Sequence, residues 1–463
     1  MRKLTIIAAL TSLTFSATAM AAPTPDQIKQ LGTTLTPWGA EIAGNKDGTI
    51  PAYTGGMATP PAGFSPEKGK WVDPFPDDKK LFSIDAKNID KYGDKVNAGL
   101  KELMKRYPDT FRMDIYPTRR SYPAQPKAYA DAALANAKNS ECKTESNGTG
   151  MRGCTLSTPF PIPSNGNEAM WNHLLRVRAL SWEIVSFNGV SDSAGNKQTP
   201  YSFMGRAEMP YLDINQKPYD GGIGNYYYRG VTRAISPARD AGNTTLIWYP
   251  LQYDKDDQRT WSYTTGQRRV RLAPEFAYDT PVAPLAGVIF YDEAQMFAGR
   301  MDMHNFKLVG KKEMYVPYHA YKAIWAPIDS VRGKHHVNPD AMRYELHRVW
   351  VVEATLKDGK RHAVPKRIFY LDEDSWTVLV MEGYDQAGKL SRVQMGHSLP
   401  NYATGLGMVD FQSSLQAYDF AQGSYLLLSN LGQPESYYKP LASRNGQFSA
   451  QFSPEAVAGR GVR

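Results

Sequence analysis

The nucleophilic residues of this sequence stand in no recognised catalytic pattern. Residues 65–68 (SPEK) match the SxxK pattern of serine acyl enzymes, but Pro66 stands where the helix of that motif should already be running, and the SDN and KTG partners are missing. The sequence also contains no GxSxG, HExxH, CxxC or GxxxxGKS/T pattern. We therefore predict no catalytic residue, and a hydrolase with an unrecognised site stays open as an alternative.

Three groups of residues have the side chains of a metal site but lack the rest of a coordination set. They are the pair His335 and His336, the pair Asp302 and His304, and the trio Asp254, Asp256 and Asp257. The histidine pair lies in a predicted loop after two basic residues, whose positive charges compete with a metal ion. The second pair has no identifiable third ligand, and the trio lacks the Gly and Glu that an EF-hand loop requires. We predict neither a metal nor a cofactor.

The first 21 residues have the pattern of a cleaved secretory signal peptide. Positive residues at positions 2 and 3 precede an apolar run from Leu4 to Ala17, and Ala19 and Ala21 are the small residues before the cleavage site. The apolar run is shorter than the ~20 residues that span a bilayer, and later apolar runs have the length of strands. The sequence predicts a periplasmic protein cleaved near Ala21/Ala22, without a transmembrane segment in the mature chain.

Cys142 and Cys154, the two cysteines of the chain, lie in one polar segment with turn-forming glycines. An oxidising compartment favours a disulfide, and two thiols without further Cys or paired His cannot complete a tetrahedral metal site. Closing so short a loop constrains the unfolded chain by roughly 3 kcal/mol. We predict that the two cysteines are bonded.

Arg268, Arg269 and Arg271 form the densest basic group of the sequence. Nucleic-acid binding combines such charge with stacking aromatic rings, but an exported protein rarely meets nucleic acid, so we predict no nucleic-acid partner. The alternation predicts a strand whose arginines face solvent while Val270 and Leu272 face the core. The positive charges then meet an anionic headgroup, a partner protein or nearby carboxylates.

Five bulky rings stand on the apolar side of predicted strands: Trp248, Tyr344, Trp350, Phe369 and Trp376. A curved sheet could turn these rings toward its concave side, where helices would close a mostly apolar cavity of the kind that binds ligands. The alternative is that the rings fill a core. The sequence alone leaves both possibilities open.

The order of helices and strands indicates an α+β protein. Residues 22–83 are rich in Pro, Gly and Thr and predict an extended arm, and helical spacing predicts helices over 84–107, 128–138 and 166–189. Beyond about residue 200, period-two alternation predicts successive strands, of which 343–356 is the clearest. We predict one β-rich domain over 84–463, with its helices mainly in 84–190 over the concave face of a large curved antiparallel sheet.

Charge and length are consistent with this single domain. The 463 residues carry a net charge of +8, of which two positive charges belong to the predicted signal peptide. Spread over such a length, the remaining charge is mild and does not by itself indicate an acidic partner.

Five stretches make the chain resemble the bacterial domain-of-unknown-function family 1329. They are LTPWGAEIAGNKDGTIPAYTGG (35–56), YTTGQRRVRLAP (263–274), KKEMYVPY (311–318), RYELHRVWVVE (343–353) and KRIFYLDEDSW (366–376). That family is similar to the periplasmic lipoprotein-localisation carriers of the Lol type. The resemblance implies a half-barrel sheet with a helical lid over a hydrophobic cavity, in an envelope protein that works beside transporters of the resistance-nodulation-division class. It supplies no catalytic residue.

Together these observations predict a non-enzymatic periplasmic carrier of a lipid-like or other hydrophobic ligand, working with an envelope transporter in outer membrane biogenesis. One alternative is an adaptor with a filled core, whose arm and basic strand dock a transporter. A second alternative is a periplasmic hydrolase with an unrecognised site.

Overall fold

The computed structural model describes residues 23–409, 415–444 and 446–460, so the predicted signal peptide and its cleavage site lie outside the described residues. The strands are β1 (Phe82–Ile84), β2 (Met113–Ile115), β3 (Lys143–Glu145), β4 (Gly150–Arg152), β5 (Ser181–Ser191), β6 (Tyr201–Glu208), β7 (Tyr226–Ser236), β8 (Thr244–Pro250), β9 (Arg259–Thr264), β10 (Arg269–Leu272), β11 (His304–Pro317), β12 (Tyr344–Leu356), β13 (Lys366–Asp372), β14 (Val378–Tyr384), β15 (Leu390–Gly396), β16 (Leu415–Asp419), β17 (Ser424–Asn430) and β18 (Tyr437–Leu441). The α-helices are α1 (Pro25–Ile28), α2 (Ala98–Arg106), α3 (Lys127–Lys138), α4 (Gly166–Leu174), α5 (Tyr321–Trp325), α6 (Ile328–Val331), α7 (Gly446–Ser449) and α8 (Pro454–Arg460).

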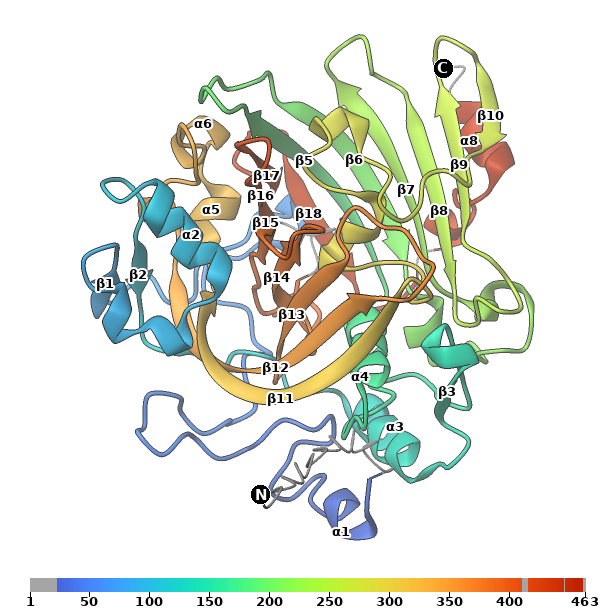
Figure 1. Cartoon of the computed structure of the whole chain (residues 1–463). Coiled ribbons are helices and arrows are strands. Elements are labelled where there is room, and N and C mark those ends of the chain that lie inside the picture. The colour runs from blue at the N-terminus through green and yellow to red at the C-terminus, as the bar shows by residue number, and fades with distance from the viewer. Residues whose placement is uncertain (1–22, 410–414, 445, 461–463) are drawn as a thin grey trace, which may run out of the picture.

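One sheet of 16 strands dominates the molecule. Its main path runs β1-β2-β12-β13-β14-β15-β16-β17-β5-β6-β7-β8-β9-β10, while β11 pairs with β12 and β18 pairs with β5. The strand pairs are antiparallel except for a single parallel contact between β2 and β12. Figure 1 shows the sheet curling around the segment that joins β10 to β11, with α4 at the lower end of the curve. The predicted α+β half-barrel is therefore confirmed, with α4 on its concave side.

Two large hydrophobic cores lie on the two sides of this curved sheet. The concave core joins α4 and the segment before β11 to rings and aliphatic side chains of β12, β13 and β14. The convex core packs α2, α5 and α6 against the opposite faces of β12, β14 and β15. Because apolar burial drives folding in proportion to area, a sheet covered on both sides is stabilised on both sides.

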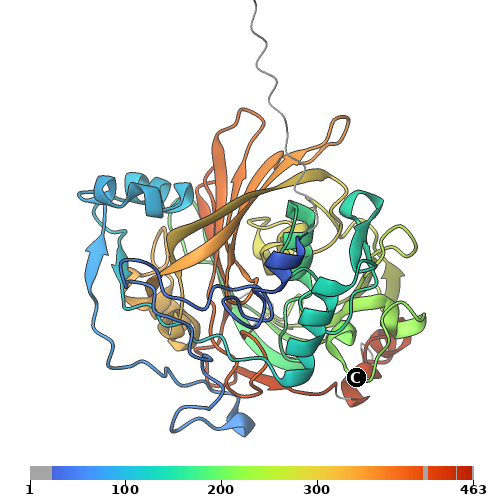
Figure 2. The same ribbon diagram turned by 90° about the horizontal axis from the view of Figure 1, so that it is seen from below.

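The arm, residues 23–81, contains little regular structure but contributes to both cores. Trp38 and Ile50 are buried in the convex core, and Trp71 is buried in the concave core. Trp38 also accepts a hydrogen bond from Trp376 Nε1 through its carbonyl, at 2.9 Å. Figure 2 shows the arm, in dark blue, running across this side of the molecule.

The helix predictions hold only in part. The predicted helix over 84–107 is α2 alone, because Asn97 caps the N-terminus with its side chain and the residues before it form only short 3-10 turns. The helix over 128–138 is confirmed as α3. The helix predicted over 166–189 ends with α4 at Leu174, and residues 181–191 form β5 instead. That apolar run fits either period, and pairing with β6, β17 and β18 in the middle of the sheet selects the strand.

Cys142 and Cys154 form the predicted disulfide, with the two sulfurs 2.07 Å apart. The bond closes the small hairpin of β3 and β4 at the outside of α3 and α4. Within the described part of the chain, no helix is both long and apolar enough to span a membrane.

Candidate functional site

The five rings predicted to line a cavity lie in three different places. Phe369 and Trp376 are at most 1% exposed in the concave core, and Tyr344 is fully buried in the convex core. Trp248 is half-buried in a small third core that β8 and β9 form with α8. Trp350 is half-buried and stacks on Trp376, with the ring centroids 5.8 Å apart. Of these five, Trp350 and Trp376 are in ring contact, while Phe369 and Tyr344 are buried in two different hydrophobic clusters.

Trp350 borders a recess of about 360 Å³ between the sheet and the arm. Lys311 Nζ lies 4.7 Å from the centroid of the Trp350 ring and 2.9 Å from Glu41 Oε1. The indole Nε1 of Trp350 is buried without a hydrogen-bond partner. The rest of the lining comes from α1, the arm and the segment before α4, through Gln27, Gln30, Thr34, Leu35, Gly39, Ala43, Pro161 and Ile162.

The predicted basic group lies on and next to β10, which is the last strand of the sheet. Arg269 and Arg271 are exposed, and Arg271 Nη2 lies 3.2 Å from Glu275 Oε1. Arg268 stands in the turn before the strand. The expectation that Leu272 faces the core is wrong, because this residue is 58% exposed at the uncovered sheet edge.

Sequence reasoning missed a buried polar chain that joins Ser121, His319 and Glu345. The Oγ of Ser121 lies 2.6 Å from His319 Nε2, and His319 Nδ1 lies 2.7 Å from Glu345 Oε1. Arg343 Nε donates to the same Glu345 oxygen at 2.6 Å. The other oxygen of Glu345 accepts the backbone N–H of Arg119 at 2.8 Å and lies 3.3 Å from His347 Nε2.

These contacts determine the charge states of Glu345 and His319. Burial alone would raise the pKa of Glu345, but His319, His347 and Arg343 outweigh it and hold this pKa well below its usual range. Burial lowers the pKa of His319 against the opposing charge of Glu345, so the imidazole is neutral near pH 7. Glu345 is thus an ionised acceptor beside a neutral imidazole.

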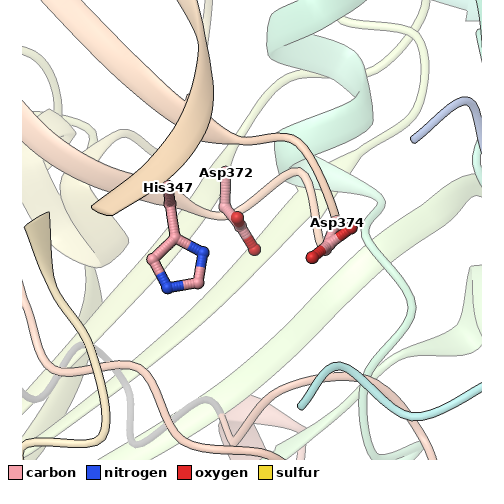
Figure 3. Close-up of side chains that lie close together, drawn as sticks. All are labelled: His347, Asp372 and Asp374. Carbon is pink, nitrogen blue, oxygen red and sulfur yellow. The ribbon is translucent and has the colours of Figure 1, made fainter. Parts of the chain in front are cut away.

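A second buried group continues from His347 to Asp372 and Asp374, and Figure 3 shows Asp372 lying between the other two side chains. One ligand-type atom from each residue lies within 4.8 Å of the others. Asp372 Oδ2 accepts hydrogen bonds from Tyr318 and Ser375, while its Oδ1 has no partner. Burial, followed by the charge of Asp374, raises the pKa of Asp372 to about 6.

This second group has the ligand types of a metal site, but Asp374 is already paired with a cation. Arg120 donates to both oxygens of Asp374, at 2.9 and 2.5 Å. A cation bound by Asp374 would have to displace this guanidinium group. The group is therefore better described as a buried ion-pair network than as a metal centre.

A partial signal for these residues was present in the sequence. The alternation of β12 places Glu345 and His347 on one face, and that polar face is read as solvent-exposed when the sequence stands alone. Ser121 and His319 come from loops 198 residues apart. Only the tertiary structure brings them to β12.

Comparison with known proteins places this chain among its relatives. The model of the family described as protein of unknown function (DUF1329) matches residues 83–458. The chain belongs to this family. An uncharacterised protein of Pseudomonas aeruginosa is 37% identical to it over 454 residues, which cover 96% of this chain and 95% of the relative.

Solved structures give more distant matches to this DUF1329 protein. A DUF1329 family protein from Desulfovibrio piger matches with a TM-score of 0.39 and 14% identity, over 60% of this chain and 92% of that chain. A LolA superfamily protein from Nitrosomonas europaea matches with a TM-score of 0.35 and 9% identity, over 62% of this chain and 97% of that chain.

Proposed function

We propose that this DUF1329 protein is a binding protein of the periplasm that holds a lipid-like molecule and passes it to or from an envelope transporter. The observation that carries the proposal is the recess beside Trp350. Its volume of about 360 Å³ falls within the range of small-molecule pockets, and apolar side chains such as Leu35 and Ile162 line it together with polar ones such as Gln27.

The chemistry of the recess suits an amphiphile with an apolar body and an anionic or carbonyl end. The Trp350 ring supplies apolar surface, and Lys311, which lies over this ring and pairs with Glu41 and Glu373, supplies a charged group at the same wall. Each CH₂ group that leaves water contributes about 0.8 kcal/mol. The interior of the half-barrel gives less support, because Phe369 and Trp376 are buried there in one hydrophobic cluster.

A titration with dodecanoate, followed by calorimetry and native mass spectrometry, tests this proposal. We expect one dodecanoate per chain, and we expect Thr34→Trp, which fills the recess from its exposed rim, to weaken binding at least tenfold. The neighbouring Thr33→Trp adds the same ring outside the recess and serves as the matched control. Equal affinity for both variants, or no binding to the unaltered protein, would refute the proposal.

The exposed edge at β10 favours a second candidate function, an adaptor that docks an acidic partner protein. An edge strand presents unpaired backbone groups to another chain, and here Arg269 and Arg271 flank it with positive charge. Photo-crosslinking from β10 in cells should capture a partner protein that Arg269→Glu with Arg271→Glu loses. The distant exposed pair Lys87→Glu with Lys217→Glu makes the same charge change and should retain it.

A further inference from the structure

The chain Ser121, His319 and Glu345 has the geometry of a nucleophile, its base and the group that orients the base. Because Glu345 is an ionised acceptor, it accepts a hydrogen bond from the N–H of His319 Nδ1, and Nε2 is left as the acceptor of the Ser121 hydroxyl. This arrangement of tautomer and hydrogen bonds is the one that activates a serine for acyl transfer.

The backbone at His319 supports a role beyond packing. His319 has φ of +52°, in the left-handed region that costs free energy for a residue other than glycine. Its N–H donates to the carbonyl of Ser398, which holds the strained conformation in place. Strain of this kind gathers at functional sites, and here it directs the imidazole between Ser121 and Glu345.

Residues 73–81 form a surface segment, called the strap here, that covers the group of Ser121, His319 and Glu345. The half-buried ring of Phe75 packs edge-on against the His319 ring, with centroids 4.9 Å apart. Asp78 of the same strap pairs with two cations, at 2.5 Å from Arg119 Nη2 and 2.7 Å from Arg343 Nη2. The strap contains no helix or strand, so few backbone hydrogen bonds oppose its displacement.

We propose that Ser121 is the nucleophile, and His319 the general base, of a carboxylic-ester hydrolase site that the strap keeps closed. Displacing the strap removes Phe75 from the face of His319 and opens space for an apolar acyl group. It also takes Asp78 away from Arg119, whose guanidinium group then becomes available to an oxyanion, while Arg343 keeps its pairing with Glu345.

The reaction then balances with water as the only co-reactant. Ser121 Oγ attacks the ester carbonyl carbon while its proton passes to His319 Nε2. The bond to the alkoxy oxygen breaks, and the alcohol leaves with that proton. Water, deprotonated by His319, attacks the acyl-serine, and the carboxylic acid and free Ser121 are released. Glu345 touches none of the reacting atoms and acts as a positioning residue.

Labelling with diisopropyl fluorophosphate tests the site directly, because this probe forms a P–O bond with an activated serine and releases fluoride. In the mature chain we expect slow labelling at Ser121, located by mass spectrometry. Phe75→Ala should accelerate labelling at least tenfold, and Ser121→Ala should abolish it. His319→Gln should slow it by about 100-fold or more, the usual contribution of a general base.

Phe276→Ala is the matched control for the loss of a half-buried ring, since Phe276 stacks on Tyr291 in the segment before β11. This variant should be labelled at the unaltered rate. Hydrolysis of p-nitrophenyl butyrate should follow the same order across the variants. Far-UV circular dichroism establishes which variants are folded, and Asp78→Asn replaces Phe75→Ala if the latter is not.

The pH dependence of the labelling rate distinguishes a positioning role of Glu345 from a purely structural one. His319 is faced by Glu345, His347 and Arg343 from β12 and the residue before it, and by the strap. Removing the carboxylate charge with Glu345→Gln should move the midpoint of the labelling rate against pH to a lower value. The inference would be overturned by labelling at another serine, by no labelling in a folded strap variant, or by an unmoved midpoint. These outcomes do not depend on whether dodecanoate binds in the recess.

Discussion

At the scale of single residues, the buried carboxylates of this protein differ in how their charge is balanced. Asp374 has the guanidinium of Arg120, and Asp292 has that of Arg367. Asp372 accepts hydrogen bonds only from neutral groups and keeps one oxygen unpartnered. Its ionised form is therefore the least stabilised of the three, which explains why its pKa rises to about 6 while that of Asp292 falls despite burial.

We predict that Asp372→Asn raises the stability of the protein near neutral pH. In the folded state Asp372 keeps its proton up to about pH 6, whereas the unfolded group loses it near its ordinary value of 3.8. The folded protein therefore binds the proton more tightly, and the unaltered protein loses stability as the pH rises from about 4 to 6. An asparagine has no such loss, and at ~1.4 kcal/mol per pKa unit the difference reaches on the order of 3 kcal/mol.

Urea unfolding of both proteins at pH 4 and pH 7 measures this difference. The gain of Asp372→Asn should be present at pH 7 and largely absent at pH 4. Asp374→Asn is the control, because it leaves the buried Arg120 without its counter-charge and should destabilise the protein. A stability difference between Asp372→Asn and the unaltered protein that does not change with pH would contradict the argument.

At the scale of elements, the sequence predicts what is local and misses what depends on neighbours. The period-two pattern predicts a strand over 343–356, which agrees with β12 to within one residue, because alternation is local. β5 is missed because its apolar run fits a helix too, and only its place in the middle of the sheet decides. Likewise, alternation gives the two faces of β12 without showing that both are covered, so Glu345 and His347 look solvent-exposed in the sequence.

The rings on neighbouring strands provide a prediction at this scale. Phe369 of β13 packs edge-on against Phe297, with the ring centroids 5.7 Å apart, and stacks on Phe306 of β11, with the centroids 6.4 Å apart. If these rings form the core rather than a cavity lining, Phe369→Ala leaves a hole and destabilises the protein by about 3–5 kcal/mol. Trp248→Ala removes a half-buried ring from β8 and should cost less. Chemical denaturation measures the loss of stability in both variants, and a Phe369→Ala variant about as stable as the unaltered protein would indicate an open interior.

At the scale of the whole molecule, the arm belongs to the fold although the family model begins at residue 83. Trp38, Ile50 and Trp71 reach two cores on opposite sides of the sheet, and the strap ties Asp78 to Arg119 and Arg343. The alignment with the Pseudomonas relative also extends over 96% of this chain. A composition rich in Pro and Gly predicts an extended arm, but only the tertiary contacts show that its tryptophans are core residues.

Truncation tests whether the arm and the sheet unfold as one unit. A chain that begins at residue 83 loses the burial of the three arm side chains, on the order of 5–10 kcal/mol at the usual values for large apolar groups. This loss is comparable to the whole stability of a typical domain, so we expect the truncated chain not to fold. Deleting only residues 23–30, which include α1 with its exposed side chains, should change the stability little.

Because both cores share β12 and β14, the mature chain should unfold in one transition, with tryptophan fluorescence and far-UV circular dichroism coinciding in urea. A truncated chain with the midpoint of the mature chain, or two separated transitions, would show instead that the arm is an appendage.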